Sequence, residues 1–125
     1  MAEKKSFKHD CESGWEFEDM NMAGTRFTNI NLSGSRFHDI NFSDVLFTAA
    51  QIGGTTFRHI GPPPCKEGGQ DRQRAVTFEE GMLCDSTFRK MDMTNVKIID
   101  SDVTGMTIDG IPVADLLGEW RKRNG

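Results

Sequence analysis

Histidine and aspartate residues are the first candidates for chemistry in this sequence. His38 and Asp39 are neighbours, and Asp39 precedes His59 by 20 residues. In a chain that winds with that period, Asp39 and His59 would lie on adjacent windings, where such a pair could transfer protons. No nucleophile or third orienting group accompanies them. We therefore interpret the pair as a cross-strand surface contact rather than a catalytic dyad.

The cysteines and glycines give no stronger signal. Cys11, Cys65 and Cys84 are too scattered for a disulfide framework, and no Cys/His spacing indicates zinc. Neither Cys65 nor Cys84 has the nearby histidine or basic cluster that would activate a thiolate. The pair Gly53-Gly54 lacks the Lys-Ser/Thr of a phosphate-binding loop. The sequence thus predicts a protein that is not an enzyme and that has no cofactor and no metal.

Composition narrows the class of protein. The chain has 125 residues, a formal net charge of −4 and a pI near 5.3. This acidic balance argues against direct nucleic-acid binding through excess positive charge. No apolar run approaches the roughly 20 residues of a membrane-spanning helix, and the first residues lack the apolar segment of a secretory signal. We expect a single cytoplasmic domain without membrane contact.

A repeat of five residues dominates the chain. An apolar residue, here called a centre, recurs at every fifth position of a first block, and then of a second block shifted by one register. The centres are Phe17, Met22, Phe27, Leu32, Phe37, Phe42, Phe47, Ile52 and Phe57, then Phe78, Leu83, Phe88, Met93, Ile98, Val103, Ile108 and Val113. Neither a helix nor a flat strand places every fifth side chain on one face. The period therefore excludes both as continuous structures.

A square winding accommodates this period. Small or apolar residues lie two positions before each centre, and pairs of polar or glycine residues, such as Ser33-Gly34, follow it. If each unit is a short face followed by a corner, four units close one circuit, and circuits stack at about 4.8 Å. The interior would then hold a ladder of aromatic side chains: Phe17, Phe27, Phe37, Phe47, Phe57, Phe78 and Phe88. Centre types also largely alternate, which gives a period of ten residues.

Units such as Ile30-Asn31-Leu32-Ser33-Gly34 and Met91-Asp92-Met93-Thr94-Asn95 resemble the pentapeptide-repeat family, A-[DN]-[LF]-x-x. The resemblance covers roughly residues 15–60 and 76–113. It departs from the family pattern where bulky Ile or Met replaces the small first residue. The resemblance implies an all-β solenoid, a right-handed quadrilateral β-helix. We expect roughly four coils.

Five segments follow from this interpretation. They are an N-terminal cap (1–14), repeat coils (15–60), a protruding loop (61–75), further coils (76–111) and a C-terminal capping helix with its tail (112–125). Phe7 and Trp15 are expected to cover the N-terminal end. Helical spacing of Val113, Leu116, Leu117 and Trp120, followed by basic residues, predicts the C-terminal helix.

Another protein is the expected partner. The candidate contacts are the proline-rich loop at Pro62, Pro63 and Pro64, and a homodimer contact at Leu116 and Trp120. We favour a non-catalytic scaffold or protein-interaction module. The alternative implied by the resemblance is a DNA-mimic protein that binds DNA gyrase or topoisomerase, either inhibiting it or protecting it from an antibiotic. Residues 76–111 carry a net charge of −4, from seven acids and three bases, but an ordinary solvated surface would look the same.

Overall fold

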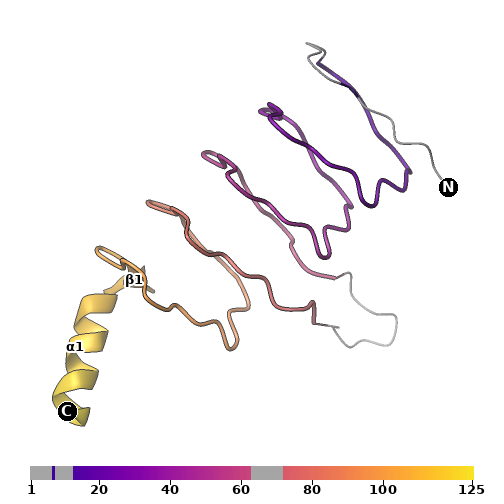
Figure 1. Cartoon of the computed structure of the whole chain (residues 1–125). Coiled ribbons are helices and arrows are strands. Elements are labelled where there is room, and N and C mark those ends of the chain that lie inside the picture. The colour runs from indigo at the N-terminus through magenta and orange to yellow at the C-terminus, as the bar shows by residue number, and fades with distance from the viewer. Residues whose placement is uncertain (1–6, 8–12, 63–71) are drawn as a thin grey trace. The chain divides into compact units, whose positions relative to one another are not determined.

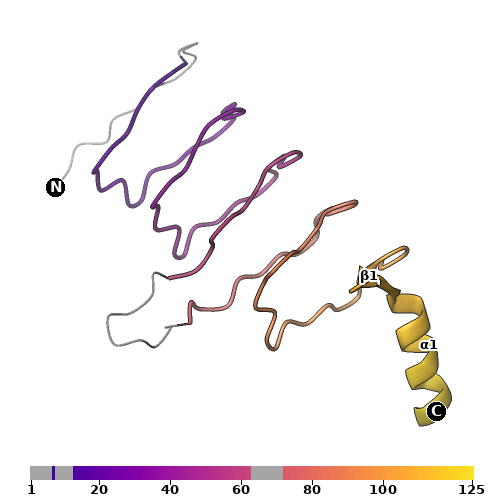
Figure 2. The same cartoon turned by 180° about the vertical axis from the view of Figure 1, so that it is seen from behind.

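The computed structural model describes residue 7 and residues 13–62 and 72–125. The chain divides into two units, Met1–Phe57 and Arg58–Gly125, and each is treated by itself below. Figures 1 and 2 show the trace of each unit bending repeatedly at short intervals. Before Thr107, the described residues form no regular helix or strand.

The repeat appears in the backbone as a left-handed residue at every fifth position. From Asp19 onward, each such residue lies two positions after a centre. The positions with positive φ are Gly14, Asp19, Gly24, Asn29, Gly34, Asp39, Asp44, Ala49, Gly54 and His59, then Glu80, Asp85, Lys90, Asn95, Asp100, Gly105 and Gly110, with Gly61, Asp109 and the terminal Gly125 outside the five-residue spacing. Asn, Asp and Gly tolerate this conformation best, which explains their frequency at these corners. The interval from His59 to Glu80 confirms the predicted shift by one register.

Hydrogen-bonded turns alternate with more open bends. The backbone N–H three residues after a centre donates to that centre's carbonyl oxygen at Met22, Leu32, Phe42, Ile52, Leu83, Met93 and Val103, with N···O distances of 3.0–3.3 Å. A left-handed residue at the third position identifies these as type II turns. Most of the intervening corners follow a phenylalanine and are bends. The ten-residue alternation predicted from the side chains is thus also present in the backbone.

A side-chain cap accompanies five of these turns. The residue before the centre accepts a hydrogen bond, through its Oδ1 atom, from the backbone N–H of the residue after the centre. The acceptors are Asn21, Asn31, Asn41, Asp92 and Asp102, with N···O distances of 2.9–3.1 Å. Asn and Asp form such bonds two residues along the chain readily. The polar second position of the repeat therefore has a local structural role.

The predicted aromatic ladder is not buried in this structure. Its seven phenylalanines keep 52–69% of their surface exposed, and the described residues include no buried hydrophobic side chain. Across the described repeat units, the backbone hydrogen bonds close local turns and leave the centres uncovered. Within the first block, however, the ring of Phe42 lies 5.6 Å from that of Phe37 and 5.8 Å from that of Phe47. These three consecutive centres thus converge, while the stacked ladder remains a prediction.

Aromatic residues also gather near the start of the described chain. The rings of Phe7 and Trp15 meet edge to face at 5.3 Å, and the rings of Trp15 and Phe17 lie 5.9 Å apart. Offset and edge-to-face contacts of this kind stabilise aromatic pairs. Phe7 and Trp15, which we expected at the N-terminal end, therefore contact one another and extend the aromatic series to the first centre of the repeat.

The C-terminal part ends in a hairpin and a helix, labelled in Figure 1. Strands β1 (Thr107–Ile108) and β2 (Ile111–Pro112) pair antiparallel, and both turn residues, Asp109 and Gly110, have positive φ. Two left-handed residues define a type I′ turn, for which Asp-Gly is a preferred sequence. The repeat coils were expected to continue through residue 111, but the structure has a hairpin from Thr107 onward.

Helix α1 (Val113–Asn124) follows directly, inside the segment predicted to be helical. Pro112 precedes its first residue, and the N–H of Val113 donates to the carbonyl oxygen of Met106 at 2.9 Å. Asp115 lies in the first turn and three basic residues lie in the last, as the helix dipole favours. The hairpin and this hydrogen bond together fix where the helix starts.

Candidate interaction surfaces

The residues first considered for catalysis do not assemble a site. Nε2 of His38 lies 3.6 Å from Oδ2 of its neighbour Asp39, and both side chains are 93% exposed. His59 occupies an exposed left-handed corner, and Cys84 is exposed in a turn. Within the described ranges, no three His, Cys, Asp or Glu side chains come together as a metal would require. An exposed pair of this kind lacks the water-excluding surroundings that strengthen proton transfer.

A polar pocket lies where the predicted loop joins the repeats. It has a volume of about 490 Å³ and is lined by Ile60, Gly61, Pro62, Arg72, Gln73, Asp92 and Thr94. We call it the loop-base pocket. Pro62 is thus the one residue of the predicted proline contact that the structure describes, whereas Pro63 and Pro64 lie outside the described residues. The pocket joins the expected interaction loop to the Asp92 cap of the second block.

The two carboxylates that cap turns, Asp92 and Asp102, have lowered pKa values. The pKa of Asp92 is lowered chiefly by the hydrogen bond from the Thr94 hydroxyl, then by the bond from the Thr94 backbone N–H, with a smaller effect of the charge on Arg72. The pKa of Asp102 is lowered by the corresponding bonds from Thr104. Hydrogen bonds donated to a carboxylate favour its ionised form. Both groups therefore stay negative in mildly acidic solution.

Helix α1 presents apolar side chains in two directions. Leu116 and Trp120, one helical turn apart, keep 43% and 63% of their surface exposed. We call this pair the outer apolar face. Near it, Arg123 Nε lies 3.6 Å from Oε1 of Glu119. The two residues predicted for a homodimer contact therefore form an accessible patch beside an ion pair.

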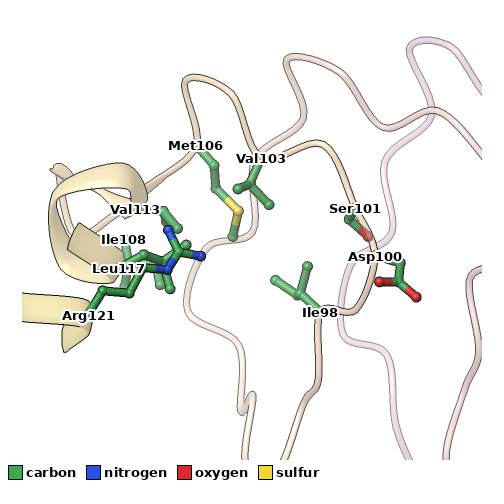
Figure 3. A pocket seen from close by; sticks show the side chains of 9 residues that line it. All are labelled: Ile98, Asp100, Ser101, Val103, Met106, Ile108, Val113, Leu117 and Arg121. Carbon is green, nitrogen blue, oxygen red and sulfur yellow. The ribbon is translucent and has the colours of Figure 1, made fainter. Parts of the chain in front are cut away.

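The adjacent side of α1 lines an apolar groove, shown in Figure 3. Its volume is about 370 Å³, and its lining consists of Ile98, Asp100, Ser101, Val103, Met106, Ile108, Val113, Leu117 and Arg121. Val113, Leu117 and Arg121 follow the four-residue spacing of a single helix face. We call this hollow the terminal groove. It lies between this side of the helix and the last repeats of the second unit.

The sequence contained the signatures of the hairpin and of the side-chain caps, but not that of the terminal groove. Asp109-Gly110 is a strong hairpin signature that the five-residue pattern obscured. The Asn and Asp residues before the centres could have been assigned as caps from their position alone. By contrast, Arg121 looked like one of three bases at a helix end, and no local pattern distinguished it as a lining residue. The position of Arg121 depends on the residue at which α1 begins after the hairpin.

Comparison with known proteins gives one match. A family model described as pentapeptide repeats (8 copies) matches residues 16–48 and 25–59. The search of curated proteins found no match, and neither did the search of solved structures. Over the described parts of the chain, no helix has the length and apolar character needed to cross a membrane.

Proposed function

Since residues 16–59 belong to the pentapeptide-repeat family, we propose that this protein is a non-catalytic scaffold that binds another protein. Proteins built from such repeats generally serve as structural or interaction modules. Short units of fixed length place outward side chains at regular intervals, which suits recognition by an extended surface. The observation that carries the proposal is the loop-base pocket, a hollow with polar side chains at the point where the repeat is interrupted.

Partner capture with a matched pair of variants tests this proposal. One variant joins Pro62 to Arg72 through a short Gly-Ser linker, and the control carries Leu46→Ala, a change at an 82% exposed outward side chain. Proteins captured by the wild-type chain should be retained by the control and lost from the loop variant. Circular dichroism verifies that both variants fold. Equal capture by all three chains would assign binding to another surface and contradict a role for the loop.

A second contact in this proposal is a homodimer through the outer apolar face. An exposed tryptophan is a favoured anchor at protein interfaces, and Leu116 would extend the apolar contact beside it. The neighbouring Glu119–Arg123 pair could exchange partners across a twofold axis. Light scattering should give twice the chain mass, and Trp120→Ala should give the chain mass. Lys122→Ala removes a side chain from the same turn and is the control. A wild-type monomer at high concentration would refute the dimer.

A gyrase-directed role is the alternative function, favoured by the charge of residues 76–111. All acidic side chains of that segment are exposed, and the lowered pKa values of Asp92 and Asp102 keep their charges in place. Such a surface could attract a protein that binds DNA. The purified chain should then change the supercoiling activity of gyrase, and Glu79→Gln with Glu80→Gln should weaken the effect. Unchanged activity at micromolar protein would remove this alternative.

A further inference from the structure

The terminal groove combines an apolar lining with one unpaired positive charge. Its walls are aliphatic or thioether side chains, including Ile98, Val103, Met106 and Leu117. In Figure 3 the guanidinium of Arg121 is directed toward Met106 and Val103, while Asp100 lies on the far side of Ile98. Among the described residues, Arg121 has no ion-pair partner, although Arg123 on the same helix does. The groove therefore carries a localised positive charge at one of its sides.

We propose that the terminal groove binds a free medium-chain monocarboxylic acid, with its alkyl chain along the apolar lining and its carboxylate on Arg121. Arginine binds carboxylates through two parallel N–H donors, which fixes the orientation of the ligand as well as its charge. The aliphatic lining suits a flexible alkyl chain, which requires no hydrogen-bond partners of its own. The volume of about 370 Å³ lies in the lower part of the range for small-molecule sites.

The lining of the groove determines both the orientation of the ligand and the driving force for its binding. Asp100 would repel a carboxylate at its own side, so the acid group is expected at Arg121 and the methyl end toward Ile98. Burial of the apolar side chains that are now about half exposed, such as Ile98 and Ile108 at 55% and 53%, supplies the driving force. The competing interpretation is that Arg121 only lays its aliphatic stem over the groove and leaves its charge in water.

Methyl NMR of the full chain with octanoate as the probe distinguishes these interpretations. The Met106 methyl group lies in the groove and should shift saturably, whereas that of Met82, which is 81% exposed and outside the groove, should not. Octanamide has the same chain without the charge and should bind more weakly. Arg121→Gln should weaken octanoate binding roughly tenfold. Lys122→Gln, which removes an equal charge outside the lining, should leave binding within twofold of wild type, about half a kcal/mol.

Each contrary outcome overturns the proposal. No shift at Met106, or equal shifts at Met106 and Met82, would mean that octanoate does not occupy the groove. Equal affinity for octanamide, or an unchanged affinity in Arg121→Gln, would mean that Arg121 does not bind the carboxylate. Melting temperatures of both variants show that they fold. The test involves neither the loop nor the outer apolar face, so its result is separate from that for protein binding.

Discussion

At the residue scale, the repeat depends on which side chains occupy the left-handed corners and the caps. Glycine, asparagine and aspartate hold most of the positive-φ positions, where each is tolerated for a physical reason. Asp92 and Asp102 cap their turns as charged groups, where the first block uses neutral asparagine. The carboxylate caps of the second block should therefore respond to pH, whereas the asparagine caps of the first block should not.

The Asp caps lead to a prediction about acid stability. Both carboxylates have folded-state pKa values below their unfolded values, so the unfolded chain binds more protons as pH falls. Their contribution is present above the unfolded pKa, about 3.9, and is lost as pH falls through the folded pKa. The melting temperature of the wild type should fall as the pH is lowered through this window. The melting temperature of the double variant Asp92→Asn, Asp102→Asn should fall less. An identical pH dependence in the two proteins would contradict this role.

Ala49 is the residue least suited to its corner. Its φ is 53°, yet it has neither the freedom of glycine nor the local hydrogen bonding of asparagine. Ala49→Gly should relieve this strain but also increase the entropy of the unfolded chain, for a net stabilisation of about 0.5 kcal/mol. Urea unfolding measures the change. Ala50→Gly, next to it and outside the left-handed positions, is the control and should destabilise; stabilisation by both would argue against corner strain.

At the element scale, the sequence predicted the repeat and the helix better than it predicted their junction. The register of the centres was readable because every phenylalanine lies on it, and the backbone follows it through the one-residue shift. The hairpin between Thr107 and Pro112 was missed because Ile108 also fits the five-residue spacing. The terminal groove could not be foreseen, since it depends on the direction that this hairpin gives to α1.

Helix α1 contains a glycine whose replacement should stabilise it. An added Cβ at Gly118 would meet no atom within 4 Å, and the residue lies in the interior of the helix. Gly118→Ala should therefore raise the free energy of unfolding by roughly 1 kcal/mol through helix propensity. Thermal unfolding followed at 222 nm measures it. Gly34→Ala makes the same chemical change at φ 76° and should destabilise instead; a loss of stability in Gly118→Ala would indicate a hidden contact.

At the scale of the whole molecule, two blocks of repeats with the same rhythm are joined across one interruption. The ten-residue alternation of turns and bends runs through residues 22–55 and again through residues 83–106. Each block generates its corners from its own sequence, with hydrogen bonds that reach only a few residues along the chain. Such local organisation is typical of repeat proteins, in which folding is cooperative through the interfaces between neighbouring units. The predicted ladder requires circuits to pack on one another, because the local turns by themselves leave its phenylalanines exposed.

This organisation predicts how the chain tolerates insertions. Ten Gly and Ser residues placed after Pro62 lengthen the interruption without changing either register, and loop-closure entropy should make them cost less than about 1 kcal/mol. One glycine placed after Gly34 adds far less chain, but it displaces Phe37 and every later centre of the block from the lattice. We therefore expect the single insertion to be the more destabilising of the two in urea unfolding. A larger loss from the ten-residue insertion would show that the interruption, rather than the five-residue register, holds the blocks in their folded form.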